Sequence, residues 1–132
     1  MGALDVVQRY FEAWNRHDAT ALVATFSRGG TYRDPAGGPG LKGEALASFA
    51  RGLWQVFPDL SFELVCAAET APDRVAAAWR LRGTHTDPGS DPVSFGDQLT
   101  LAGQNFIEVE GDKIRSVEAH FDPQPIPKHL EL

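Results

Sequence analysis

The sequence predicts an α+β fold, in which three N-terminal helices pack on a curved, mainly antiparallel β-sheet. Two observations favour this class. Apolar residues recur at helical spacing up to Pro58 and alternate with polar residues after it. The chain has 132 residues, which suits one domain, 1–132, and leaves too little material for a second core. Helices that precede antiparallel strands must cover one face of the sheet, and a strongly curved sheet leaves a hollow beneath them.

The helical pattern ends at recognisable signals. The helices are predicted at residues 2–16, 19–26 and 43–57. Asp18 is the expected N-cap of the second helix, and Pro58 closes the third. The Ser-Arg-Gly-Gly stretch at 27–30 should end the second helix, before a short β-prone piece at 31–34. The glycines and prolines of residues 35–40 then predict a loop.

Two β-hairpins account for most of the remaining chain. Their strands are predicted at residues 62–66, 75–81, 98–110 and 113–121. The turns are Ala-Pro-Asp-Arg at 71–74 and Glu-Gly-Asp at 110–112, and a polar linker at 85–96 joins the hairpins. Three prolines at 123, 125 and 127 predict that the tail wraps over an edge or the mouth of the fold.

Charge and hydropathy exclude several classes of partner. The formal net charge is −6 at pH 7 and the pI is about 5.1, whereas nucleic-acid binding requires a clustered basic face. No apolar run approaches the roughly eighteen residues of a membrane span, and the N-terminus shows neither a basic leader nor an apolar signal region. We therefore expect a cytoplasmic protein that binds neither nucleic acid nor membrane.

The cysteine and histidine positions give no sign of a metal or another cofactor. Cys66, the one cysteine, lies in a strand-like apolar run and should be a small buried hydrophobe, not a nucleophile. The four histidines lack His-x-His or His-x-x-x-His spacing with a nearby carboxylate. His120 should be structural and face away from the pocket, and His85 with Asp87 could form part of its rim. Surface positions are expected for His17 and His129.

Three segments of the N-terminal half form a known pattern. They are Arg-Tyr-Phe-Glu-Ala-Trp-Asn-Arg-His-Asp at 9–18, Thr-Tyr-Arg-Asp-Pro-Ala-Gly-Gly at 31–38 and Gly-Glu-Ala-Leu-Ala-Ser-Phe at 43–49. Together they resemble the N-terminal half of the Δ5-3-ketosteroid isomerases. Tyr10 and Asp34 stand as far apart as that family's oxyanion-hole tyrosine and proton-carrying aspartate, with no gap between them.

The middle and the end of the chain are similar to a sister group. The segments are Phe-Pro-Asp-Leu at 57–60, Ala-Trp-Arg-Leu-Arg-Gly-Thr-His-Thr at 78–86 and Phe-Asp-Pro-Gln-Pro at 121–125. They resemble SnoaL-like polyketide cyclases. Both groups share the nuclear transport factor 2-like fold, so the resemblance implies a cone-shaped domain around one apolar pocket. One scaffold of this kind hosts many activities, so the activity must be argued from the site.

Two positions depart from these families. Asn105 stands where the isomerases carry a protonated aspartic acid and the cyclases a histidine. Ala119 stands where the cyclases carry their catalytic aspartate, so the cyclase mechanism cannot be transferred. The isomerase pattern is kept at Tyr10 and Asp34, and Phe121 matches that family's pocket aromatic.

The resemblance and the side-chain chemistry predict a catalytic set. Asp34 would be the general base, with Tyr10 and Asn105 as donors to an oxygen that gains charge. Each also has a structural interpretation: a solvated turn residue before a proline, a core tyrosine, and an amide that satisfies buried backbone. The aromatic residues expected at the pocket are Trp14, Trp54, Trp79, Phe106 and Phe121. For most of them the sequence alone does not distinguish a pocket wall from ordinary core.

These predictions indicate a cofactor-independent acid–base enzyme of isomerase or cyclase type. Its substrate would be a small hydrophobic compound that contains a ring and a carbonyl group. A non-catalytic module that binds a hydrophobic ligand or a protein remains the alternative. An epoxide hydrolase is less favoured, because residues 78–84 carry Arg80 and Arg82 but no Arg-x-Asp pair. Relatives of this fold pair through the open sheet face, so a homodimer is expected.

Overall fold

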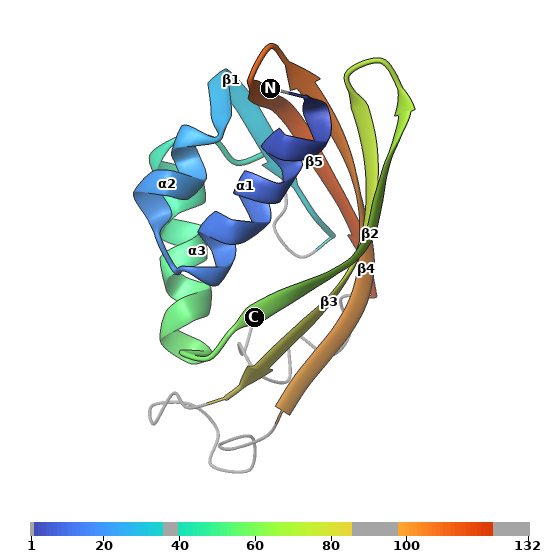
Figure 1. The fold of residues 1–132 in the computed structure, drawn as a ribbon. Helices are drawn as coiled ribbons and strands as arrows, with labels where there is room; N and C mark the ends of the chain where they lie inside the picture. The colour runs from blue at the N-terminus through green and yellow to red at the C-terminus, as the bar shows by residue number, and fades with distance from the viewer. Residues whose placement is uncertain (1, 36–39, 86–97, 123–132) are drawn as a thin grey trace.

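The structure is a computed structural model that describes residues 2–35, 40–85 and 98–122. Within these ranges the elements follow in the order α1 (Ala3–Asn15), α2 (Ala19–Ala24), β1 (Phe26–Arg33), α3 (Glu44–Val56), β2 (Ser61–Ala71), β3 (Arg74–Thr84), β4 (Gln98–Glu110) and β5 (Lys113–Phe121). The helices lie together on one side of a curved sheet (Figure 1). The predicted α+β class is therefore confirmed.

The helices form where the apolar spacing and the end signals indicate. The inward positions of α1 are buried: Ala3, Val6, Val7, Tyr10, Phe11, Ala13 and Trp14. Asp18 is the N-cap of α2, and its Oδ1 accepts a hydrogen bond from the Ala21 amide at 2.9 Å. At the end of α1, the Asn15 side chain bonds both the amide and the carbonyl of Phe62, at 2.7 and 3.0 Å. This pair of bonds fixes α1 to the edge strand β2.

Strand β1 begins earlier than expected, because residues 27–30 lie within it and do not form a loop after α2. Gly29 has a φ of 83°, and a Cβ at Gly30 would lie 2.6 Å from the Ile114 carbonyl oxygen of β5. The register with β5 shifts between Phe26 and Thr31, so the glycines bulge while the strand continues. Glycine usually weakens a strand, which is why the sequence pattern indicated the end of the second helix here and not the start of a strand.

The sheet has the strand order β1-β5-β4-β3-β2. β1 pairs with β5 in parallel, and the other neighbours are antiparallel. Both predicted hairpins are present, and their turns contain residues with positive φ, Asp73 at 62° and Gly111 at 64°. Residues 86–97, which include most of the predicted linker at 85–96, and the proline-rich tail at 123–132 lie outside the described residues.

Cys66 is exposed, so its expected burial is wrong. The register between β2 and β3 shifts after the Leu64–Trp79 pair, and Cys66 then pairs with Ala78. The extra residue, Val65, interrupts the alternation of side chains. The bulge therefore turns Cys66 to the outer face of the sheet, and the next residue inward is the half-buried Ala67.

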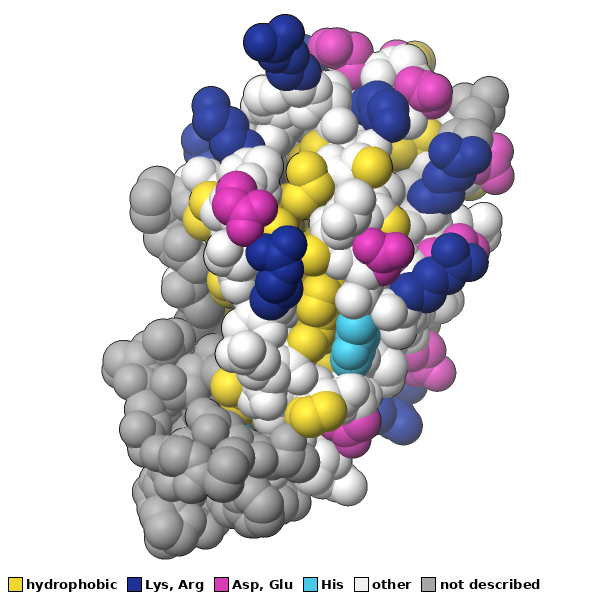
Figure 2. Space-filling model, turned by 90° about the vertical axis from the view of Figure 1, so that its left-hand side faces the viewer, with side chains coloured by type: hydrophobic (Ala, Val, Ile, Leu, Met, Phe, Trp, Pro, Cys, Tyr) yellow, Lys and Arg dark blue, Asp and Glu magenta, His cyan; other side chains and the backbone are white. Residues whose placement is uncertain are grey.

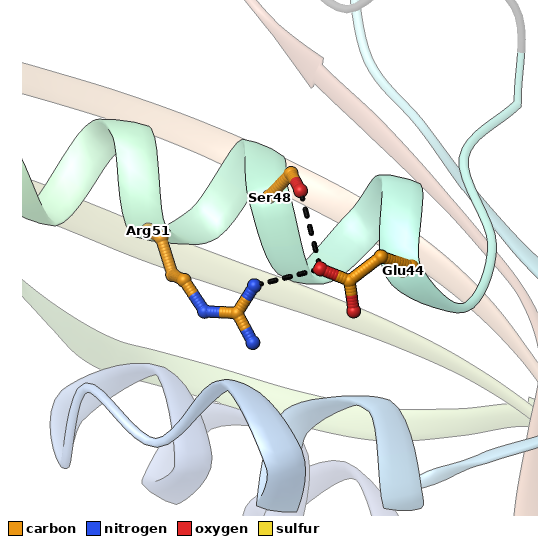
Figure 3. A network of polar contacts seen from close by, with 3 residues as sticks. All are labelled: Glu44, Ser48 and Arg51. Carbon is orange, nitrogen blue, oxygen red and sulfur yellow. Dashed lines mark hydrogen bonds and ion pairs between the residues drawn. The ribbon is translucent and has the colours of Figure 1, made fainter.

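The helix side of the molecule carries charged side chains of both signs, interspersed around an apolar stripe (Figure 2). On α3, Arg51 forms an ion pair with Glu44 at 2.9 Å, and Ser48 donates a hydrogen bond to the same carboxylate at 3.4 Å (Figure 3). Exposed pairs of this kind contribute about 1 kcal/mol or less. Among the described helices, none is both long and apolar enough to cross a membrane.

Candidate functional site

A cavity of about 440 Å³ lies between the helices and the inner face of the sheet. Its size falls within the range of about 300–1,000 Å³ that is typical of ligand sites. Most of its lining is apolar or aromatic: Trp14, Phe49, Leu53, Phe57, Phe62, Trp79, Leu81, Leu99, Leu101 and Phe121. The polar groups in the lining include Tyr10, Tyr32, Asp34 and Asn105. The three residues predicted to be catalytic thus line one cavity.

Asp34 follows the end of β1 and is partly buried. Its Oδ2 accepts a hydrogen bond of 2.6 Å from the hydroxyl of Tyr32. Residues two apart on an extended chain point to the same side, which brings the two groups together. The structural interpretation of Asp34 as a solvated turn residue therefore does not describe its surroundings.

Tyr32 is a site residue that the sequence analysis did not identify. Its side chain is buried, and burial raises the pKa of its hydroxyl well above the usual range, with Tyr10 and the Asp34 charge adding to the rise. The phenol therefore stays protonated and can donate to Asp34 at neutral pH. The alternation of side chains from Tyr32 to Asp34 was the signal that could have revealed the pair.

Tyr10 lies on the inward face of α1 and is 1% exposed. Burial raises the pKa of its hydroxyl above the ordinary value, the indole of Trp14 opposes this rise, and the Asp34 charge adds to it. The Trp14 N–H lies near the Tyr10 oxygen but makes no hydrogen bond of normal geometry with it. Tyr10 is thus a protonated phenol at the cavity, in contact with the rings of Phe11 and Phe26.

Asn105 lies on the inner face of β4 and is 3% exposed. Its Oδ1 accepts a hydrogen bond of 2.9 Å from the indole Nε1 of Trp79. Because an indole N–H can only donate, the atom that faces it must be the amide oxygen. The Nδ2 group is then the part of Asn105 that can donate to a ligand. The hydrogen-bond partner of the Asn105 oxygen is thus the Trp79 side chain and not the backbone.

Three of the five predicted pocket aromatics line the cavity: Trp14, Trp79 and Phe121. Trp54 is not part of the lining, because it packs behind Trp14 at 5.7 Å between ring centroids and stacks on His17 at 5.0 Å. The prediction for Phe106 is wrong: it is 49% exposed. Neighbouring residues of a strand face opposite sides, so an inward Asn105 places Phe106 on the outer face.

The described histidines lie away from the polar groups of the cavity. His120 is exposed on the outer face, as expected, with its Nε2 at 3.3 Å from Glu118. His85 is fully buried beside Phe57 and is not an open rim residue, while Asp87 lies outside the described residues.

His17 differs from its expected surface position. It is partly buried and forms a hydrogen bond of 2.8 Å between its Nε2 and the Leu60 carbonyl. The other histidine with an expected surface position, His129, lies outside the described residues. Within the described part of the chain, no group of three or more His, Cys, Asp or Glu residues could hold a metal ion.

Arg80 and Arg82 are exposed on β3 and do not line the cavity. The structure therefore places neither arginine where an epoxide hydrolase would need it. What the cavity does combine is a carboxylate, two protonated phenols and an amide among apolar walls. Such a set can move a proton and stabilise a developing negative charge on an oxygen.

Comparison with solved structures shows the same architecture in proteins of several descriptions. A Xanthomonas campestris protein assigned as a polyketide cyclase is 29% identical, with 97% of this chain and 96% of that chain covered and a TM-score of 0.73. AclR from Streptomyces galilaeus, assigned as a hydroxylase, is 18% identical, with 98% and 95% covered and a TM-score of 0.77. A protein with a ketosteroid isomerase-like fold from Catenulispora acidiphila, in complex with trimethylamine, is 18% identical, with 96% and 92% covered and a TM-score of 0.78.

No curated protein matches the chain at a significant level. The SnoaL-like domain family matches residues 7–117, which span most of the chain and nearly all of the described helices and strands. The resemblance in the sequence and the architecture of the cavity agree with this match. The chain therefore belongs to the SnoaL-like domain family.

Proposed function

We propose that this protein is a cofactor-independent acid–base enzyme, of isomerase or cyclase type, that acts on a small hydrophobic compound with a ring and a carbonyl group. The observation that carries the proposal is that Asp34, Tyr10 and Asn105 line one largely apolar cavity. In this proposal Asp34 is the proton carrier, and the Tyr10 hydroxyl and the Asn105 amide bind the carbonyl oxygen.

The reaction would begin at a C–H bond next to the carbonyl group. The Asp34 carboxylate takes the proton, the C–H electron pair forms a C=C bond, and the carbonyl π electrons move to the oxygen. Tyr10 and Asn105 donate hydrogen bonds to this enolate oxygen. Isomerisation follows if Asp34 returns the proton at another carbon. Cyclisation follows if the enolate carbon attacks a second carbonyl carbon in the same molecule: the π electrons of that carbonyl move to its oxygen, which takes the proton back from Asp34.

The apolar walls support this chemistry. Water competes for both the base and the oxyanion, and a cavity lined by Phe and Leu side chains keeps it away. The Xanthomonas campestris relative assigned as a polyketide cyclase is consistent with substrates that contain several carbonyl groups. Tyr10 stays protonated because burial raises its pKa, so its donor is present throughout the neutral range.

The test is conjugation of a β,γ-unsaturated 3-ketosteroid, followed as the rise of the enone absorbance. Wild type should convert it and Asp34→Asn should not, while Tyr10→Phe should lose about 10²–10³ in rate. Asp73→Asn is a matched control, because Asp73 lies in the exposed β2–β3 turn at a positive φ that asparagine tolerates. Equal rates in Asp34→Asn and wild type would remove Asp34 from the mechanism.

A second candidate function is binding without turnover. The relative from Catenulispora acidiphila was solved in complex with trimethylamine, and aromatic rings beside a carboxylate are suited to an alkylammonium cation. This chain has aromatic walls and Asp34 in its cavity. Calorimetry with trimethylamine tests this candidate: saturable binding that Asp34→Asn weakens, without turnover of any ketone, would favour a binding module.

We also propose that the protein pairs through the outer face of the sheet. Val65 and Phe106 are 51% and 49% exposed, and both lie on this face. Burial of such side chains favours a two-fold dimer. Light scattering of wild type and Phe106→Lys tests the proposal, with a dimer expected for the first and a monomer for the second. A monomeric wild type would contradict it.

A further inference from the structure

Two tyrosines line the cavity, and their hydroxyl groups have different surroundings. The Tyr32 hydroxyl donates to Asp34 at 2.6 Å. A phenol has one proton to donate, so this bond uses the donor of Tyr32. The Tyr10 hydroxyl makes no such bond to a carboxylate within the described residues. The two hydroxyl groups therefore have different roles at the cavity.

Tyr32 is held in place from several sides. Its backbone forms two hydrogen bonds with Leu41, at 2.8 and 2.7 Å, and its Cα is paired with Val117 of β5. Its ring packs against Phe49 with centroids 5.8 Å apart. A side chain with a fixed backbone on both edges and a packed ring is a rigid donor.

Asp34, in contrast, lies just beyond the last residue of β1. The chain continues into Pro35, and the backbone bridge in this region is formed by Tyr32 with Leu41 and does not include Asp34. Because Asp34 has no place in a strand ladder, the orientation of its carboxylate depends on side-chain contacts, of which the bond from Tyr32 is short and charge-assisted.

We propose that Tyr32 is the positioning residue of the base: its hydroxyl holds Oδ2 of Asp34, so that the carboxylate is oriented toward the substrate. Tyr32 acts on the reaction through Asp34 and does not contact the reacting atoms. This inference rests on the proposed acid–base function. It assigns separate roles to two buried phenols, of which the family resemblance indicated only Tyr10.

The bond itself can be observed without a substrate. A short hydrogen bond to a carboxylate should give a slowly exchanging hydroxyl proton far downfield in the ¹H NMR spectrum. We expect this signal in wild type and in Tyr10→Phe, but not in Tyr32→Phe. In Asp34→Asn it should move upfield, because a neutral amide accepts a weaker bond. A wild-type spectrum without the signal, or a signal that Asp34→Asn leaves unchanged, would overturn the inference.

The role in the reaction is tested by hydrogen–deuterium exchange at C2 of 1-tetralone, a bicyclic ketone. Tyr32→Phe should lower kcat about tenfold with KM nearly unchanged, since the base is less well oriented. Tyr10→Phe, the matched variant, should lower kcat/KM and keep the downfield signal that Tyr32→Phe loses.

The outcomes separate this inference from the proposed function. Exchange by wild type with an unchanged kcat in Tyr32→Phe would refute the role of Tyr32 alone. Failure of wild type to exchange the C2 proton, with the downfield signal present, would refute the acid–base function and with it any role of Tyr32 in that reaction. Circular dichroism of Tyr32→Phe and Tyr10→Phe checks that both variants fold.

Discussion

Gly103→Ala should disrupt the cavity wall, because Gly103 faces Trp79 across the β3–β4 ladder. A Cβ at this position would lie 2.4 and 2.6 Å from the Cζ2 and Cη2 atoms of the indole, and 2.9 Å from the His120 carbonyl oxygen. Ordinary carbon–carbon contacts are about 3.5–4.0 Å, so the ring or the strand must move by about 1 Å. Either movement strains the hydrogen bond from Trp79 to Asn105.

The expected loss of stability combines two effects. Overpacking costs about 1–3 kcal/mol, and loss of the buried hydrogen bond costs about 1 kcal/mol more. We therefore expect the free energy of unfolding to fall by about 2–4 kcal/mol, measured by urea titration with tryptophan emission as the signal. Loss of the Trp79 bond should also lower activity, because the Asn105 amide is no longer oriented.

Gly52→Ala is the matched control. Gly52 lies within α3 and also lines the cavity, but no atom lies within 4 Å of a Cβ placed there. Alanine in a helix is favoured over glycine by about 1 kcal/mol, so this variant should be as stable as wild type or more stable. A Gly103→Ala protein as stable as wild type would refute the packing described for Trp79.

Three further predictions follow from the polar groups. Burial raises the pKa of both Tyr10 and Tyr32, so the free energy of unfolding should be unaffected below pH about 10 and fall above it, by up to about 1.4 kcal/mol per pH unit for each tyrosine. In Tyr10→Phe the fall due to Tyr10 should be absent, as measured by urea titration at pH 9–11. Asp59 accepts hydrogen bonds from the amide and hydroxyl of Thr84, and these bonds lower the pKa of Asp59 in the folded protein. The stability that Asp59 contributes is therefore present above pH about 4 and is lost as the pH falls through this lowered pKa. Asp59→Ala should lower the free energy of unfolding by about 1 kcal/mol at pH 7 and by less at pH 3. Asn105→Asp should raise the rate about tenfold in the enone assay. Burial keeps the new carboxyl group neutral, and a carboxylic acid donates a stronger hydrogen bond than an amide. A slower variant would contradict this.

The sequence predicted the elements whose patterns are local. The helical spacing of α1 and α3, the Asp18 cap and the two hairpin turns all appear where the residues indicated. The errors occur where a contact between strands overrides the local pattern. Gly30 belongs to β1 because it fits against Ile114, and Cys66 turns outward because β2 bulges against β3.

The candidate site was predictable in part. The resemblance to the ketosteroid isomerases implied that Tyr10 and Asp34 share one cavity, and both line it. Simple alternation from Asn105 would have placed Phe106 outside. The Trp79–Asn105 bond was not predictable, because it depends on the register of β3 with β4, in which Trp79 pairs with Gly103. A glycine there lets the indole reach diagonally to Asn105, and sequence alone does not give that register.

In the proposed reaction Asp34 removes a proton from a carbon next to a carbonyl group. Deuterium incorporation at C2 of 1-tetralone in D₂O, followed by NMR with wild type and Asp34→Asn, tests it independently of the later fate of the enolate. We expect exchange well above the uncatalysed rate for wild type and none above that rate for Asp34→Asn. Exchange by both proteins at the same rate, or by neither, would contradict it.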